Sequence, residues 1–139
     1  MKTVIAFGAF DGLHPGHLDY FKQAKVYGDI LVVSVGTDKN VEKIKGKRPL
    51  FNQDERLELV DSCKFVDKAV LGSETDFYQH IKSVEPDVIC LGYDQWVKEG
   101  DLRAELKKVG LSDMEIYRLK PYEKYRAKST ITKSKSVDF

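Results

Sequence analysis

This 139-residue sequence has only two cysteines, no long apolar run and almost no excess of charge of either sign. Of the two cysteines, Cys63 falls in a helical pattern and Cys90 in an apolar strand pattern. We interpret both as buried small hydrophobic residues, and not as a disulfide or a metal pair. No apolar run approaches the roughly 20 residues that span a bilayer. The sequence therefore predicts neither a disulfide scaffold nor a membrane span.

The charge balance is equally informative. The sequence has 23 Lys and Arg residues and 22 Asp and Glu residues, which gives a net charge of +1. A protein that binds nucleic acid nonspecifically needs a basic excess, so this class is excluded. Residues 1–3 lead directly into an apolar run, with no signal region before it. We expect a cytoplasmic protein with one domain over residues 1–139 and a substantial core. Only the last ~10 residues have the composition of a disordered segment.

Short apolar runs alternate with amphipathic stretches along the chain. The runs have the length of buried strands and the stretches each carry one apolar stripe, a pattern that predicts an α/β fold. We expect a three-layer, doubly wound sheet of five parallel strands in the order 3-2-1-4-5. The expected strands are residues 4–7, 30–35, 68–71, 88–91 and 114–119.

Helices are expected between these strands. Pro15 lies in the first turn of a helix that runs to Gly28, and Asn52 caps another. A third carries the stripe Phe77, Ile81 and Val84 and also His80, which we interpret as structural or exposed. The last begins at Gly100 or Asp101 and ends at Gly110.

The most informative stretch is residues 8–17, GAFDGLHPGH, between the first strand and the first helix. A helix that starts at the carboxyl end of a parallel strand directs its positive dipole end into the crevice where such sheets bind phosphates. His14 and His17 are three positions apart, so both rings can face that point and each can donate a hydrogen bond to one phosphate. The alternatives are a pair of metal ligands or two capping histidines.

This stretch resembles the Gly-x-Phe-Asp-x-x-His-x-Gly-His signature of the cytidylyltransferase-like nucleotidyltransferases. The resemblance implies a Rossmann-like fold and transfer of a nucleoside monophosphate from ATP or CTP to a phosphate of a second substrate, with release of pyrophosphate. It also implies that the reaction uses Mg²⁺, which the phosphates mainly hold and for which no protein ligand is assigned. The family further implies a homodimer. The implied catalytic residues are His14 and His17, and the implied nucleotide contacts here are Ala9, Phe10, Asp11, Pro15 and Gly16.

Two further stretches fit this resemblance. Residues 43–49 form a basic loop, from which Lys45 and Lys47 could reach the outer phosphates of a nucleotide; the alternative is a solvated loop. Arg56 follows a glutamate, as an arginine does in the family, where the pair packs below the phosphate loop. The alternative for Arg56 is an ordinary surface arginine paired with aspartates one turn away.

Residues 91–95, LGYDQ, end the fourth strand at the same sheet edge. Gly92 would let a flat base approach the backbone, and Asp94 could accept a hydrogen bond from a ribose hydroxyl or a base amine, or help to hold Mg²⁺. The stretch is similar to the Leu-Gly-Tyr-Asp-Gln of archaeal FAD synthases and close to the Gly-Asp-Asp-Trp of glycerol-3-phosphate cytidylyltransferases. The longer match favours ATP and FMN as the substrates.

The tail occupies the place of the family's third motif, in which Arg126, Ser129 and Thr130 would bind the leaving pyrophosphate. The Gly-Ile of that motif is missing here. Transfer of AMP from ATP to FMN is therefore the leading interpretation. One alternative is a cytidylyltransferase that acts on glycerol-3-phosphate or another phosphorylated alcohol. The other is a nucleotide-binding regulatory module that has lost catalysis.

Overall fold

The computed structural model describes residues 1–122 of the chain. Within them, five strands form one parallel sheet in the order β3-β2-β1-β4-β5, which confirms the predicted order. The order reverses between β1 and β4, so the topological switch point, where such sheets bind ligands, lies at the carboxyl ends of these two strands. The strands are β1 (Thr3–Gly8), β2 (Ile30–Val35), β3 (Lys68–Leu71), β4 (Val88–Leu91) and β5 (Glu115–Arg118).

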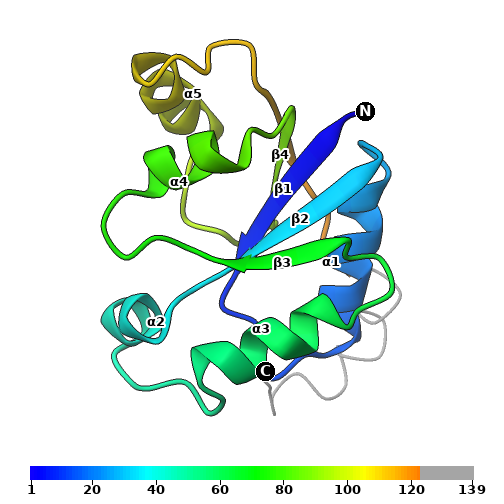
Figure 1. Ribbon diagram of the computed structural model, residues 1–139, viewed down its shortest axis with the longest axis vertical. Helices are drawn as coiled ribbons and strands as arrows, with labels where there is room; N and C mark the ends of the chain where they lie inside the picture. The colour runs from blue at the N-terminus through cyan, green and yellow to red at the C-terminus, as the bar shows by residue number, and fades with distance from the viewer. Residues whose placement is uncertain (123–139) are drawn as a thin grey trace.

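Helices cover both faces of the sheet (Figure 1). On one face α1 packs on β1 and β2, and α3 packs on β2 and β3. On the other face lie α4 and α5, whereas α2 lies beyond the carboxyl ends of the strands (Figure 1). The predicted three-layer α/β arrangement is thus confirmed. The helices are α1 (Pro15–Lys25), α2 (Asp38–Lys45), α3 (Gln53–Asp61), α4 (Phe77–Val84) and α5 (Glu99–Lys108).

The helix α2 was not expected from the sequence. The Thr37 hydroxyl accepts a hydrogen bond from the Asn40 N–H at 3.2 Å and caps its start, and Gly46, at φ +78°, ends it in the left-handed conformation. Val41 is its one buried residue, so a hydrophobic stripe is hardly visible in the sequence. The basic loop predicted at residues 43–49 therefore begins only at Gly46, and Lys45 is the last helical residue.

Three other helix boundaries differ from the predictions. The first helix ends at Lys25 rather than Gly28. The last begins at Glu99, one or two residues earlier than predicted, and ends at Lys108 rather than Gly110. The predicted cap at Asn52 is confirmed, because its side chain accepts from the Glu55 N–H at 2.9 Å and the Glu55 carboxylate accepts from the Asn52 N–H at 2.9 Å.

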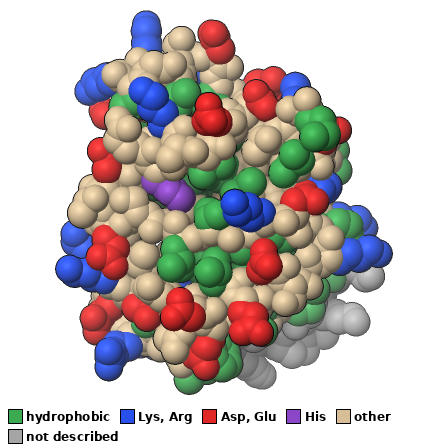
Figure 2. Space-filling view, viewed as in Figure 1, with side chains coloured by type: hydrophobic (Ala, Val, Ile, Leu, Met, Phe, Trp, Pro, Cys, Tyr) green, Lys and Arg blue, Asp and Glu red, His purple; other side chains and the backbone are tan. Residues whose placement is uncertain are grey.

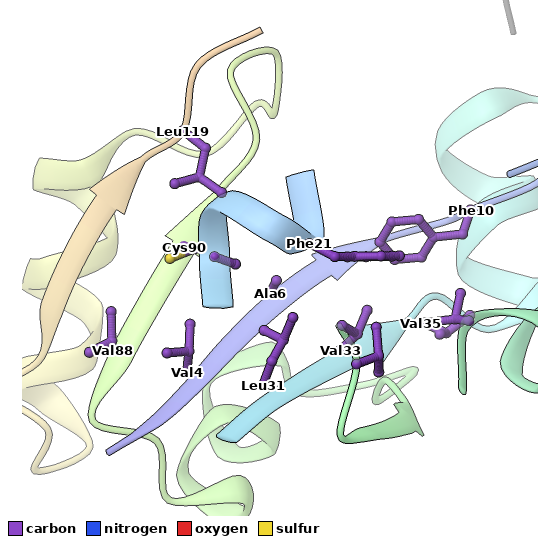
Figure 3. Packing of buried hydrophobic residues seen from close by; sticks show 13 residues of the cluster. Val4, Ala6, Phe10, Phe21, Leu31, Val33, Val35, Val88, Cys90 and Leu119 are labelled. Atoms are coloured by element: carbon purple, nitrogen blue, oxygen red, sulfur yellow. The ribbon is translucent and has the colours of Figure 1, made fainter. Parts of the chain in front are cut away.

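The core has two parts, one on each face of the sheet. Figure 3 shows the first, where strand residues such as Val4, Ala6 and Val33 pack with Phe21 of α1, whose ring lies beside that of Phe10. The second lies under α4 and α5 and includes Ile5, Ile81 and Leu102. Of the cysteines, Cys90 is buried as predicted and Cys63 is half-buried. Val4, Ile5 and Ala6 of β1 are fully buried, so this strand contributes to both parts of the core just before the turn that follows it.

The surface agrees with the balanced composition. Figure 2 shows both basic and acidic side chains on one face of the molecule, with several Asp and Glu side chains gathered over its lower part. Within residues 1–122 there is no helix of the length and apolar character that crossing a membrane requires.

Candidate active site

The two histidines of the glycine-rich turn lie at the start of α1, with ring centroids 3.9 Å apart and planes tilted by 30°. His14 is the N-cap of the helix, and its Nδ1 accepts a hydrogen bond from the Gly16 N–H at 3.1 Å. His17 Nδ1 accepts from the His14 N–H at 3.3 Å. The two side chains thus form a reciprocal capping box made of imidazoles. The prediction that both rings lie together at the helix start is confirmed.

These contacts fix the position of the ring protons. An Nδ1 atom that accepts a hydrogen bond carries no proton, so each neutral imidazole must be protonated at Nε2. Capping and phosphate binding are therefore compatible roles, because one ring nitrogen caps the helix and the other is a donor. The amides of Gly16 and His17 already donate to His14. Hydrogen bonds to a phosphate at this point would thus come from imidazole Nε2–H groups, with the helix dipole as additional support.

The surroundings keep both rings neutral. Burial lowers the pKa of His14. Burial lowers the pKa of His17 to about 4, and the nearby His14 and the Lys45 ammonium contribute to this shift. The Lys45 ammonium at the end of α2 is thus close enough to act on the charge of His17. At neutral pH the site therefore presents neutral donors beside a cation, which is suited to an anionic ligand.

The lowered pKa of His17 predicts an acid-dependent loss of stability. Between the ordinary pKa of 6.5 and about 4, the unfolded chain binds a proton at this ring that the folded chain does not. Stability should therefore fall as the pH is lowered through this window, and the loss from this group should level off below it. Urea unfolding at pH values across the window measures it. A His17→Asn variant should lose less stability than the native protein over the same range, and equal losses would contradict the assignment.

Phe10 lies beneath the histidines and not in the crevice. It is buried, its ring meets that of His17 edge-on at a centroid distance of 5.3 Å, and it packs on Phe21 at 5.2 Å. Its backbone is in the left-handed region at φ +54°, which is uncommon for an aromatic residue. A Cβ at Gly8 would lie 2.5 Å from the Phe10 ring, which explains the glycine there. The Phe10 side chain therefore supports His17, so a nucleotide could meet only its backbone.

Asp11 and Arg56 connect the histidine turn to α3 and to the loop before it. The Asp11 carboxylate accepts hydrogen bonds from the Leu50 and Phe51 N–H groups at 2.7 and 3.0 Å. The Arg56 guanidinium is completely buried. It donates to four groups: the carbonyls of Ala9, Gly36 and Phe51 at 2.7–2.9 Å and the Asp38 carboxylate at 2.8 Å.

The alternative of a surface arginine is therefore wrong for Arg56. Its aspartate partner lies at the start of α2, 18 residues away, and not one turn along its own helix. The interpretation of an arginine packed below the phosphate loop fits the contacts. Arg56 acts by fixing the backbone of Ala9 and Gly36, and Asp11 by fixing the loop before α3.

Residues 92–95 follow β4, on the other side of the switch point from the histidine turn. Gly92 is buried and Asp94 exposed. Arg118 of β5, which the sequence did not single out, donates to the carbonyls of Gly92 and Gln95 at 2.8 and 3.0 Å. The Tyr20 hydroxyl lies at the switch point, 3.2 Å from the Phe7 carbonyl and 3.3 Å from the Cys90 carbonyl. Burial raises its pKa, and the Asp94 carboxylate adds to this shift.

The remaining predicted site residues differ in their exposure, and three of them lie outside the described residues. Pro15 is exposed at the first position of α1, and Lys47 is exposed in the loop after α2. A Cβ at Gly16 would lie 2.8 Å from the His14 ring, so glycine there lets the ring cap the helix. The predictions for the last ten residues and for three site residues fall outside residues 1–122: Arg126, Ser129 and Thr130.

His80 has a structural contact. Its Nε2 lies 2.8 Å from the Ser34 hydroxyl of β2, 46 residues away, and so ties α4 to the sheet. It borders a hollow of about 420 Å³ that also includes Val32, Lys68 and Val70 and none of the predicted site residues. No group of three or more His, Cys, Asp or Glu side chains in the described part of the chain is arranged to hold a metal ion.

Comparison with known proteins gives a consistent picture. Residues 5–135 match the family described as cytidylyltransferase-like. The FAD synthase of Aciduliprofundum boonei is 45% identical over 122 residues, which cover 88% of this chain and 80% of that protein. The FAD synthase of Thermoplasma acidophilum is 39% identical over 138 residues, 99% of this chain and 96% of that protein.

A solved structure from Thermoplasma volcanium, described as a lipopolysaccharide core biosynthesis protein, is also similar. It superposes with a TM-score of 0.84 at 42% identity, covering 88% of this chain and 98% of that one. A pantoate-β-alanine ligase from Francisella tularensis has a TM-score of 0.57 at 15% identity and shares the fold.

Proposed function

Because the chain belongs to the cytidylyltransferase-like family, we propose that it transfers AMP from ATP to FMN and so forms FAD and pyrophosphate. Relatives that are 39–45% identical over 88–99% of this chain are FAD synthases, which supports this choice of substrates. The histidine turn supports the reaction type, and it does so independently of the names of relatives.

The observation that carries the proposal is the pair of imidazoles with capped Nδ1 atoms. Two neutral rings 3.9 Å apart present their Nε2–H groups at one helix start. A phosphoryl-type transition state spreads negative charge over the equatorial oxygens of the phosphorus, and fixed donors stabilise that charge. Because the helix caps hold the rings in place before the substrate binds, little reorganisation is needed during the reaction.

The proposed reaction is one in-line displacement. A phosphate oxygen of FMN attacks the α-phosphorus of ATP, the bond from this phosphorus to the oxygen that bridges to the β-phosphate breaks, and pyrophosphate leaves. Mg²⁺ enters as part of the MgATP substrate and neutralises charge on the phosphates. No covalent intermediate with the protein is required.

The other residues have supporting roles in this proposal. Lys45, Lys47 and the tail residues Arg126, Ser129 and Thr130 would bind the leaving pyrophosphate, and Gly92 and Asp94 would bind the nucleoside. Ala9, Asp11 and Gly16 would shape the phosphate turn. The homodimer that the resemblance implies stays a prediction, which sedimentation would test.

Parallel assays with FMN and either MgATP or MgCTP test the proposal. We expect pyrophosphate release with ATP, matched mole for mole by FAD identified by chromatography, and no release with CTP. A third assay offers glycerol-3-phosphate as the acceptor. Turnover with CTP and glycerol-3-phosphate but not with ATP and FMN would refute the proposed substrates. Nucleotide binding with no pyrophosphate release in any assay would indicate a regulatory module.

A further inference from the structure

The hydrogen-bond ladder between β1 and β4 stops before β1 ends. Paired residues run as far as Ala6 and Cys90, whereas β1 continues to Gly8. In this register, the next main-chain hydrogen bond of a parallel ladder would join the Gly92 N–H to the Phe7 carbonyl. The side-chain amide of Gln95 stands between these two groups instead. Its Nε2 donates to the Phe7 carbonyl at 2.7 Å, and its Oε1 accepts from the Gly92 N–H at 2.9 Å.

The orientation of this amide is fixed by its partners. A carbonyl can only accept and a backbone N–H can only donate, so the flipped amide would lose both hydrogen bonds. The bare Cα of Gly92 faces the same amide, because a Cβ there would lie 3.3 Å from Gln95 Cγ. Gly92 therefore leaves room for Gln95, a role beyond the close approach of a base that the sequence predicts.

Gln95 thus joins the segments that follow the carboxyl ends of β1 and β4. On one side it holds Phe7, directly before the turn that carries the histidines. On the other it holds the first residue of the turn that carries Asp94, which Arg118 fixes from its carbonyl side. Separation of two neighbouring strands at their carboxyl ends is what opens the binding crevice in folds of this type. Here the Gln95 amide lies in that separation, beyond the Tyr20 hydroxyl, which is 3.2 Å from the Phe7 carbonyl and 3.3 Å from the Cys90 carbonyl.

We propose that Gln95 is a positioning residue that sets the width of the nucleotide crevice between β1 and β4. The proposal rests on the proposed function, because it assumes that the nucleoside binds at residues 92–94. Gln95 acts through the Gly92 N–H and the Phe7 carbonyl and does not itself bind the reacting atoms. Its loss should therefore weaken nucleotide binding more than it slows the chemical step.

A Gln95→Glu variant tests this idea, because its behaviour depends on pH. A protonated glutamate has one O–H donor and one carbonyl acceptor, as the amide has, whereas an ionised glutamate has no donor and repels the Phe7 carbonyl. Because the Phe7 carbonyl disfavours the ionised form, we expect the pKa of the introduced carboxyl group to be higher than that of a solvated glutamate. Between about pH 5 and pH 8, we expect the KM for ATP of the variant, relative to the native enzyme, to rise about 10-fold, with a smaller change in kcat.

Two further variants separate positioning from simple loss of stability. Gln95→Met has a similar length but neither donor nor acceptor, so its KM for ATP should be raised by a similar factor at every pH. Gln79→Glu introduces the same charge at an exposed position of α4 and should match the native enzyme throughout. A Gln95→Glu variant with the native KM at all pH values would overturn the proposal, as would a native KM in Gln95→Met.

Binding can be read without catalysis, which separates this proposal from the proposed function. Trp96 is the only tryptophan of the chain, is exposed and is adjacent to Gln95, so its fluorescence can report ATP binding. If the native protein makes no FAD but the affinity of Gln95→Glu for ATP still weakens with rising pH, the positioning role stands and the proposed reaction fails. If ATP binds both proteins equally at every pH, the positioning role fails.

Discussion

The His17→Asn enzyme is expected to keep its fold and to lose about 10²–10³-fold in kcat for FAD formation, with little change in ATP affinity. In the native protein the His14 N–H donates to His17 Nδ1, with 3.3 Å between the two nitrogens. The Oδ1 of asparagine can take the place of Nδ1 and accept this hydrogen bond. Asparagine has no group at the position of Nε2, so the donor to the α-phosphate is lost while the helix cap stays. Steady-state kinetics together with urea unfolding at neutral pH measure both effects.

Complementary substitutions sharpen this result. Glutamine at position 17 can place an amide N–H near the native Nε2 but cannot keep the cap, so His17→Gln should retain more kcat than His17→Asn while being less stable. His80→Asn is the matched control, because His80 contacts Ser34 of β2 outside the site and its loss should leave kcat unchanged. The proposed role of His17 would be wrong if His17→Asn turned over at the native rate.

Arg56→Ala is expected to destabilise the protein by about 3–5 kcal/mol, because removal of the buried guanidinium leaves three carbonyl acceptors without their donor. The carbonyls of Ala9, Gly36 and Phe51 would lose their donor. A typical domain has only about 5–15 kcal/mol of stability, so the variant should be near the limit of folding. The urea midpoint and the thermal unfolding temperature measure this loss.

Two variants calibrate the Arg56 result. Arg56→Lys keeps the charge, but an ammonium cannot reproduce the planar set of donors, so it should recover only part of the stability. Arg103 is exposed and makes one hydrogen bond to the Met114 carbonyl at 2.9 Å, so Arg103→Ala should cost about 1 kcal/mol or less. An Arg56→Ala protein that unfolds at the native urea concentration would contradict the bracing role of Arg56.

The sequence was sufficient for the strands, their order and the position of His14 and His17. The central strands β1, β2 and β4 are largely buried, so each is an apolar run that can be recognised locally. The histidines follow directly from the strand, the glycines and Pro15, whose spacing determines where the helix starts. Local patterns thus predict the parts of the site that lie within one continuous segment.

The rest of the site depends on contacts between distant segments. Arg56 reaches Ala9 and Gly36 over 47 and 20 residues, and Gln95 reaches Phe7 over 88 residues. No local pattern distinguishes such a buried arginine or glutamine from a solvated one. The signal for Gln95 was present in LGYDQ, but its role becomes visible only where the ladder between β1 and β4 ends.

A crystal structure with Mg²⁺ and an ATP analogue that cannot be cleaved between the α- and β-phosphates is the most direct test of the account. We expect the Nε2 atom of His17 within about 3 Å of an α-phosphate oxygen, with Nδ1 still capping the helix and the nucleoside between β1 and β4. A triphosphate bound away from both histidines, or His17 turned so that Nδ1 faces the phosphate, would contradict it.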